Sequence, residues 1–202
     1  MKTRFNSPLS PDEQRLIADA FRRGEVCLFP TDTVYGLGCR ADNAVGAATI
    51  YRLKGRPIEK SLPLLIGSWE QFNQYCAKIP PKYRKRLEKV WPGALTVVVQ
   101  ATDKARKLSF HCLKEGTVAV RMPNHPVLRY IIEKVGLPLA STSANKSGAV
   151  EALSLEMVNL DIRREVGVAW SEVIPNGQAI PSTVVDLTGA EPVVLREGAG
   201  PF

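Results

Sequence analysis

The 202-residue sequence contains few of the side chains that build metal centres and disulfide frameworks. It has only four cysteines and two histidines, and no two cysteines form a Cys-x-x-Cys pair. Four scattered cysteines are too few for a disulfide framework, and these ligands lack the spacing of a zinc site. A Ser-His-Asp triad would need His111 or His125, and neither comes with a Gly-x-Ser-x-Gly elbow. We therefore expect no protein-bound metal and no catalysis of this kind.

Long apolar runs are missing as well. No run approaches the roughly 18 residues of a membrane span, and the opening residues MKTRFNSPLS carry no apolar core of a secretory signal. We therefore expect a cytoplasmic protein without a membrane partner. The two commonest nucleotide fingerprints, GxxxxGK[ST] and a GxGxxG after a strand, are also absent from the sequence.

Positive charge is in excess and unevenly spread. The chain carries 27 Lys and Arg against 20 Asp and Glu, and residues 52–114 alone carry 14 against 4. This excess indicates an anionic partner. One contributing group is Arg52, Lys54, Arg56 and Lys60; the other is the run over 78–89. That run fits either a solvated helix face or a phosphate or nucleic-acid patch.

The remaining composition predicts a folded α/β protein. With 45 % hydrophobic and 23 % charged residues, the chain fits one domain over 1–202. Ser10, Pro11 and Glu13 form a helix-start signature, and Gly24 is placed to end that helix. Helices are predicted over 11–23, 44–53, 68–76, 81–90 and 125–135, and strands over 26–29, 62–66, 95–99, 118–121, 183–187 and 193–195. The alternation favours a sheet covered on both faces, with ligands at the carboxyl ends of strands.

Four loops carry the polar chemistry: 30–38, 54–61, 141–148 and 181–186. In the second, Gly55 and Pro57 favour an irregular turn on which Lys54 and Arg56 converge. Such a pair suits a polyphosphate, because Arg forks two oxygens and Lys acts as a point charge. The third loop offers hydroxyl and backbone N–H groups that can hold phosphate. Each loop also fits a plain structural role, as a polar turn, a solvated charged turn or a helix cap.

Two further groups of side chains can join the same cleft. Thr117 and Arg121 bracket the strand over 118–120, and Arg196 follows Ser182 by fourteen residues, at the end of the next predicted strand. A strand-end Arg also fits a purely structural pairing with an acid. The loop over 172–181 contains Pro175, Asn176 and Gly177 and is predicted to be a long loop rather than a domain linker.

Taken together, the segments resemble the threonylcarbamoyl-AMP synthase family, which has the YrdC-like domain. The matching strings, in order between Phe29 and Leu195, are PTDTVYGLG, KGRPIEKSLPLLI, WPGALTVVV, TVAVRMPNHP, LASTSANKSG and PSTVVDL. The resemblance implies a twisted open mixed sheet flanked by helices, around a large basic concave cleft. It also implies a nucleotidyltransferase that condenses L-threonine, bicarbonate and ATP into threonylcarbamoyl-AMP and pyrophosphate, for the threonylcarbamoyladenosine modification of tRNA.

The resemblance assigns roles by position. It places Lys54 and Arg56 at the ATP phosphates, where we expect them to act in catalysis. The positions matching L-threonine contacts are Thr33, Arg121, Ser141 and Ser182. Those matching further ATP contacts are Lys60, Thr117, Ser143 and Arg196. Mg²⁺ is expected on the triphosphate rather than in a protein cage, and a tRNA threonylcarbamoyl transferase complex is expected to take the product.

The sequence departs from this pattern at three points. Leu65 stands where some members have a histidine near threonine, Lys60-Ser61 replaces their Asn-Pro, and the length matches the short form without a second domain. Other interpretations stay open: a paralogue with an altered reaction, or a module that binds tRNA or double-stranded RNA without catalysis. A hydrogenase-maturation carbamoyltransferase is disfavoured, because the chain has no Cys-x-x-Cys pair.

Overall fold

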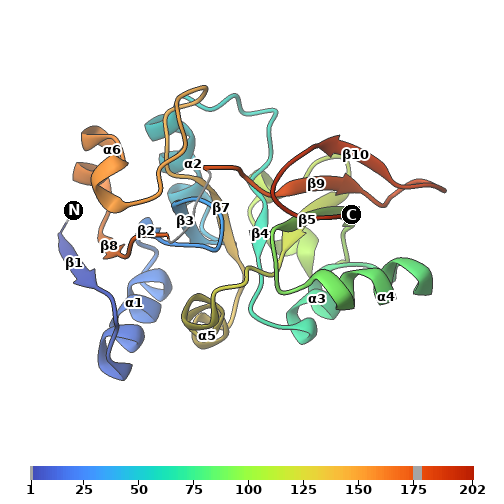
Figure 1. The fold of residues 1–202 in the computed structure, drawn as a ribbon, viewed down its shortest axis with the longest axis horizontal. Helices are drawn as coiled ribbons and strands as arrows, with labels where there is room; N and C mark the ends of the chain where they lie inside the picture. The colour runs from blue at the N-terminus through green and yellow to red at the C-terminus, as the bar shows by residue number, and fades with distance from the viewer. Residues whose placement is uncertain (1, 175–178) are drawn as a thin grey trace.

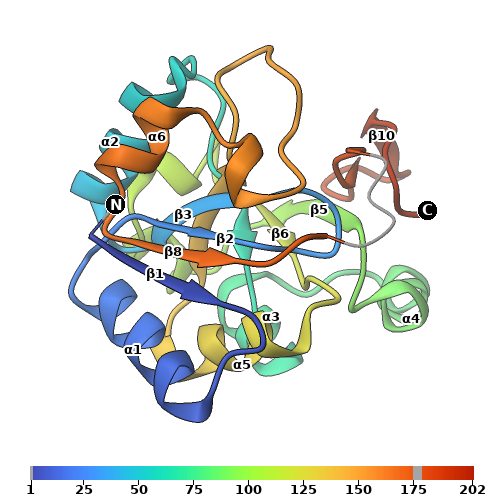
Figure 2. The same ribbon diagram turned by 60° about the vertical axis from the view of Figure 1, so that its left-hand side comes forward.

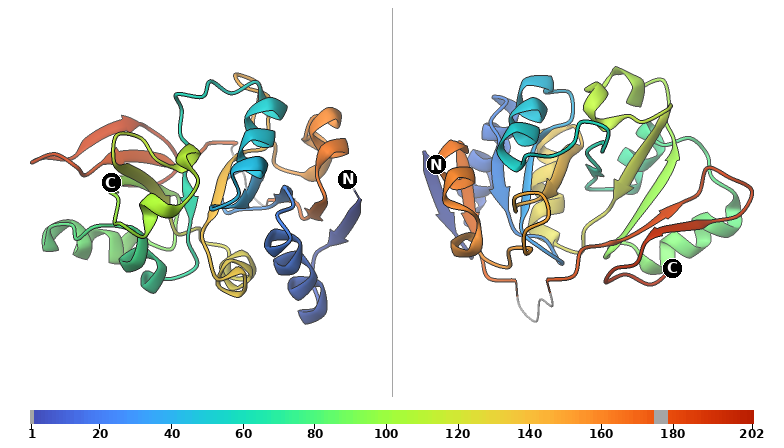
Figure 3. Two further views of the ribbon diagram at one scale, coloured as in Figure 1. Left: turned by 180° about the vertical axis from the view of Figure 1, so that it is seen from behind. Right: turned by 90° about the horizontal axis from the view of Figure 1, so that it is seen from above.

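Ten strands form one mixed sheet in the computed structural model, which describes residues 2–174 and 179–202. The strand order is β1-β8-β2-β3-β7-β4-β6-β5-β9-β10. The bounds are β1 Thr3–Asn6, β2 Cys27–Phe29, β3 Gly36–Arg40, β4 Leu64–Leu65, β5 Leu95–Gln100, β6 Thr117–Arg121, β7 Leu139–Ser143, β8 Val168–Ser171, β9 Thr183–Asp186 and β10 Val193–Arg196. The two edges, β1 and the β9–β10 hairpin, lie at opposite ends of the molecule (Figure 3). The predicted open mixed sheet is therefore confirmed.

Helices cover both faces of this sheet. α1 (Pro11–Arg22) and α5 (Pro126–Val135) pack together on one face, around Phe21, Ile131 and Trp170. α2 (Ala44–Lys54) and α6 (Leu160–Glu165) lie on the other face (Figure 2). α3 (Trp69–Tyr75) and α4 (Pro81–Val90) lie beneath the C-terminal strands (Figure 1). Short 3₁₀ turns occupy Ala105–Lys107, Phe110–Cys112 and Leu155–Met157.

The helix-start signals act as predicted. The Ser10 hydroxyl accepts from Glu13 N at 3.3 Å, and the Glu13 carboxylate accepts from Ser10 N at 2.7 Å, which completes a capping box. Asn43 caps α2 through its side chain, which accepts from Gly46 N at 2.9 Å. Because α2 ends at Gly55 in the left-handed region, with φ of 63°, the chain turns sharply just after Lys54.

The loop predicted over 30–38 is shorter than expected. Gly36, Leu37 and Gly38 belong to β3, which pairs antiparallel with β2, so the polar residues before them form a hairpin loop. The Phe29 ring lies directly over Gly36, where a Cβ atom would sit 2.4 Å from Cε2 of that ring. Glycine here thus marks a close contact within the sheet rather than a flexible loop.

Three further strands were not predicted. β1 and β8 are short and pair parallel with each other, and β7 extends through Ser143 into a segment predicted to be a loop. Residues 141–143 of β7 are all hydroxylated, so the sequence lacks there the alternation of apolar and polar residues that indicates a strand. The predicted loop residues Pro175, Asn176 and Gly177 lie outside the described residues.

The basic run over 78–89 lies mostly on α4. Lys82, Lys85, Arg86 and Lys89 are exposed, while Tyr83 and Leu87 are buried beneath them. Arg84 stacks over the Trp69 ring at 3.8 Å. This arrangement fits the interpretation of a solvated helix face. In the described part of the chain, no helix is both long and apolar enough to cross a membrane.

Candidate active site

A cavity of about 510 Å³ brings all four polar loops together. Its lining includes nine of the residues that the resemblance singled out: Thr33, Lys54, Arg56, Lys60, Arg121, Ser141, Ser143, Ser182 and Arg196. They come from the end of α2, from β6, β7 and β10, and from the loops next to these elements, on both sides of the short strand β4. Leu65, at the position where some relatives have a histidine, also lines the cavity.

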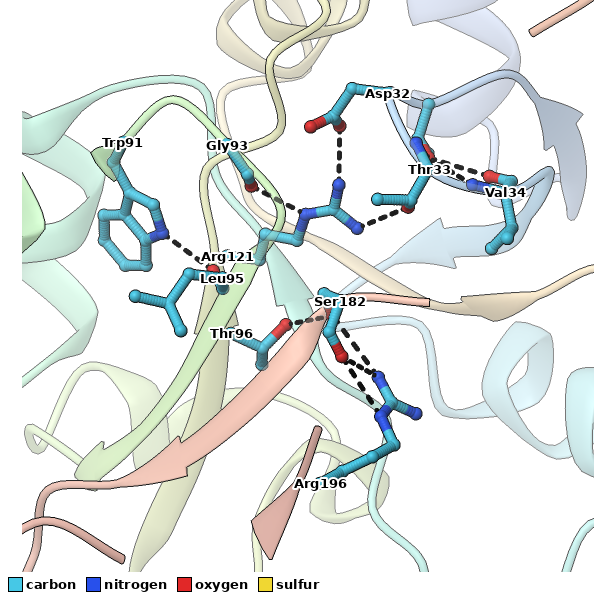
Figure 4. Close-up of polar contacts among 11 residues, drawn as sticks. Asp32, Thr33, Val34, Trp91, Gly93, Leu95, Thr96, Arg121, Ser182 and Arg196 are labelled. Atoms are coloured by element: carbon cyan, nitrogen blue, oxygen red, sulfur yellow. Dashed lines mark hydrogen bonds and ion pairs between the residues drawn. The ribbon is translucent and has the colours of Figure 1, made fainter. Parts of the chain in front are cut away.

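Arg121 is held at the end of β6 by three acceptors (Figure 4). Its Nη1 donates to Thr33 Oγ1 at 2.8 Å, and its Nε donates to Gly93 O at 3.0 Å. Nη2 forms an ion pair with Asp32 Oδ1 at 2.6 Å, and the two side chains are 7 % and 14 % exposed. Burial lowers the pKa of Arg121, and the Asp32 carboxylate opposes that shift. The guanidinium is thus oriented before any ligand arrives, and it remains cationic.

The Thr33 hydroxyl is fixed in turn by Thr31. Thr31 Oγ1 donates to Val34 O at 2.7 Å and accepts from the backbone N–H groups of Thr33 and Val34. Because that donation uses its only hydroxyl proton, the 3.1 Å contact between the two threonines has Thr33 as donor. Thr31 was not predicted from the sequence as a site residue. The Thr-x-Thr spacing could have indicated it, because this spacing is typical of a side chain that caps its own turn.

Lys54 also lines the cavity and is only 3 % exposed. Its Nζ donates to Ser143 O and Asn145 O, both at 2.5 Å, and to Asn145 Oδ1 at 3.1 Å. Ser143 Oγ donates to the same Asn145 Oδ1 at 2.6 Å. Burial lowers the pKa of Lys54 to about 8, while the charge of Glu151 opposes the shift. Lys54 therefore joins the end of α2 to the loop after β7.

Arg56 closes the loop that follows α2. Its Nε donates to Lys60 O and its Nη2 to Ser61 O, both at 2.9 Å. Tyr51 OH donates to Lys60 O at 2.8 Å from the helix itself. The Gly and Pro of this segment thus allow a compact turn that presents Lys54, Arg56 and Lys60 to one cavity, as predicted.

The third part of the lining comes from the C-terminal hairpin. Arg196 Nη2 donates to Ser182 O at 2.6 Å, and Ser182 Oγ lies 2.7 Å from Thr96 Oγ1 (Figure 4). Burial lowers the pKa of Arg196, and Glu151 again opposes the shift. The prediction that Ser182 and Arg196 face one cleft is confirmed.

Thr117 is not brought to the cavity with the other predicted residues. It does not line the cavity, and its hydroxyl donates to Lys114 O at 2.6 Å. Thr117 starts the strand that Arg121 ends, and at about 3.3 Å per residue the two backbones stand roughly 13 Å apart. Its predicted ATP contact therefore has no support in this arrangement.

Thiols and metal clusters are not part of this cavity. All four cysteines are free and buried, and burial raises the pKa of Cys39 and Cys112 to about 12. Within residues 2–174 and 179–202, no group of three or more His, Cys, Asp or Glu could hold a metal ion. The cavity therefore offers cations, hydroxyls and amides, which suit the binding of a carboxylate and of phosphates.

The structure thus defines an α/β protein with an open mixed sheet and a cavity lined by cations and hydroxyls. Residues 19–198 match the family model Sua5/YciO/YrdC, which is described as telomere recombination. The chain belongs to this family. It is 37 % identical over 166 residues to the threonylcarbamoyl-AMP synthase of Pseudoalteromonas translucida, with 81 % of this chain and 87 % of that protein covered. It is also 37 % identical over 182 residues to the Bacillus subtilis threonylcarbamoyl-AMP synthase, with 90 % of this chain and 52 % of that protein covered.

A solved structure agrees with these matches. The crystal structure of Pyrococcus abyssi Sua5 complexed with L-threonine superposes with a TM-score of 0.87 at 33 % identity. The match covers 98 % of this chain and 57 % of that one. The present chain thus spans about half the length of the longer relatives.

Proposed function

We propose that this protein is a threonylcarbamoyl-AMP synthase, a nucleotidyltransferase that uses L-threonine, bicarbonate and ATP. The observation that carries the proposal is the joining of two kinds of site in one cavity: the Arg121–Thr33 pair, and the loop of Lys54, Arg56 and Lys60. The names of the relatives and the L-threonine bound to P. abyssi Sua5 support it. We further propose that the chain acts as one domain in the cytoplasm and supplies a tRNA threonylcarbamoyl transferase complex.

The Arg121 side of the cavity would hold the amino acid. A guanidinium forks the two oxygens of a carboxylate, and the hydroxyls of Thr33, Ser141 and Ser182 can bond the remaining polar groups of threonine. All four side chains are buried. A preformed, desolvated pocket is the environment in which such polar contacts select one ligand.

The Lys54 side would hold the nucleotide. Lys54, Arg56 and Lys60, with Ser143 and Arg196, would contact the phosphates. The amino group of threonine and bicarbonate first form a carbamate with loss of one water. The carboxylate of this carbamate then attacks the α-phosphorus as the bond to pyrophosphate breaks. The step needs no covalent enzyme nucleophile. It needs alignment of the reactants and stabilisation of charge on the phosphates, which fixed cations supply.

Mg²⁺ enters this proposal as part of the nucleotide substrate. One carboxylate lines the cavity among the described residues, so the protein offers no complete cage for the ion. Mg²⁺ usually binds through phosphates, waters and one or two carboxylates, which fits this lining. Bound there, it would neutralise part of the triphosphate charge.

An assay of pyrophosphate release tests the proposal. Purified protein is given ATP with and without L-threonine and bicarbonate, beside an Arg56→Ala variant whose folding is checked by thermal unfolding. We expect release that depends on both co-substrates and that is lost in the variant. Release without either co-substrate would overturn the proposal. Salt-sensitive binding of tRNA without any threonine-dependent turnover would favour the RNA-binding alternative instead.

A further inference from the structure

Glu151 has no role in the arrangement described so far. It lies in the loop after β7 and is the one carboxylate among the described residues that line the cavity. The other charged side chains of that lining are all cations: Lys54, Arg56, Lys60, Arg121 and Arg196. No motif singled it out, because a lone glutamate in a loop carries no spacing signal.

One oxygen of its carboxylate is buried without a partner, although the residue as a whole is only partly buried. Within the described chain, Glu151 Oε2 has almost no solvent exposure and no hydrogen-bond partner. No ion pair within 4.0 Å involves this residue in that part of the chain either. Its charge nonetheless acts on both Lys54 and Arg196, which come from α2 and β10. Glu151 therefore lines the same cavity as these two cations but forms no ion pair with either.

A buried carboxylate oxygen without a partner is costly, and most such atoms in proteins are satisfied by some group. The cost rises when a triphosphate enters the same cavity, because two anions then face each other in a poorly solvated space. A divalent cation between them removes the repulsion. Mg²⁺ accepts hard oxygen ligands from one or two carboxylates together with phosphates and waters.

We infer that Glu151 is the protein's ligand for the divalent cation that accompanies the nucleotide triphosphate, bound directly or through one metal-held water. The inference rests on the proposed function, because it needs a triphosphate in the cavity. It adds a metal contact that the cationic loop cannot provide. It also explains why a carboxylate is present among cations that would bind phosphate better without it.

The competing explanation is that Glu151 only balances the charge of Lys54 and Arg196. Only the metal-ligand explanation predicts an effect of Glu151 that depends on Mg²⁺. A counter-ion weakens ATP binding equally with and without Mg²⁺. A metal ligand strengthens binding of the Mg²⁺ complex and weakens binding of free ATP.

Isothermal titration calorimetry separates them. ATP is titrated in Mg²⁺ and, separately, in EDTA, into the wild type, Glu151→Gln and the matched control Glu70→Gln. Glu70 is exposed on α3 and does not line the cavity, and its change removes the same charge. In Mg²⁺ we expect Glu151→Gln to bind ATP about tenfold more weakly than the wild type, the lower end of the effect usual for a metal's partner residues. In EDTA we expect Glu151→Gln to bind ATP as tightly as the wild type or more tightly. We expect the control to bind ATP like the wild type in both Mg²⁺ and EDTA.

An equal change in both media, or no change in either, would overturn the inference. Electron paramagnetic resonance of Mn²⁺ with ATP gives a second readout, since the bound Mn²⁺ spectrum should differ between wild type and Glu151→Gln. Thermal unfolding confirms that the variant folds. If only the inference is wrong, the wild type still shows threonine-dependent pyrophosphate release. If the proposed function is wrong, that release is absent even when the metal effect on ATP binding is present. A wild type that binds no ATP overturns both.

Discussion

Raising the pH should weaken nucleotide binding through one buried ammonium group, that of Lys54. Burial lowers its pKa to about 8, from an ordinary value of 10.5. Above that pH the folded protein loses the proton, and with it the charge that would face a phosphate. Because a bound phosphate favours the protonated form, linkage requires the affinity for ATP to fall as pH rises through this range.

The size of the effect follows from the protonated fraction. With a pKa of about 8, this fraction drops from about nine-tenths near pH 7 to about one-tenth near pH 9. If only the cation binds phosphate, the affinity for ATP falls about tenfold over that interval, or about 1.4 kcal/mol. The affinity is measured by calorimetry across the pH range at constant ionic strength.

Lys54→Arg is the matched control, because a guanidinium keeps its charge over the whole interval. Other titrating groups, including those of ATP itself, act equally on both proteins. The difference between the two pH profiles therefore isolates Lys54. Parallel profiles for the wild type and the variant, once thermal unfolding shows that both are folded, would refute the reasoning.

Three further changes have expected outcomes. Asp32→Asn removes the counter-charge of buried Arg121 and should lower the free energy of unfolding by about 3 kcal/mol. In thermal unfolding, L-threonine should then raise the Tm of the variant more than that of the wild type, because its carboxylate replaces the lost charge. An equal rise in both proteins would count against carboxylate binding at Arg121. Gly36→Ala forces a methyl group against the Phe29 ring and should cost about 1–3 kcal/mol in urea denaturation, so an unchanged midpoint would contradict the close contact. Lys85→Glu on the exposed face of α4 should leave pyrophosphate release within about twofold of the wild type, and a larger loss would give the basic run a part in the reaction.

Helices were the most predictable part of the fold. The start of α1 was predicted at Ser10, because proline, hydroxyl and glutamate signals act within one turn of the chain. α4 was predicted over 81–90 and begins at Pro81, although it has no side-chain cap. The strands that were missed depend on distant partners instead. β1 and β8 support each other across more than 160 residues, so neither has a local signal that a sequence pattern could reveal.

The candidate site was largely predictable for a different reason. Its loops carry hydroxyls, glycines and cations in recognisable strings, and nine of the ten singled-out residues line one cavity. Thr117 does not line the cavity because it stands at the other end of β6 from Arg121, and spacing along one strand does not reveal which end faces the cavity. Thr31 and Glu151 were missed because their roles arise from contacts made only in the folded chain.

The hydrogen bonds from Arg196 to Ser182 have a consequence for how the protein reaches its working form. The cavity draws residues from Thr31 through to Arg196, so the chain must place its last strand before the lining is complete. Contacts between residues so far apart in sequence form late and slowly in folding. A chain emerging during synthesis therefore stays without a complete ligand site until β10 has been made, and ligand binding becomes a measure of folding through β10.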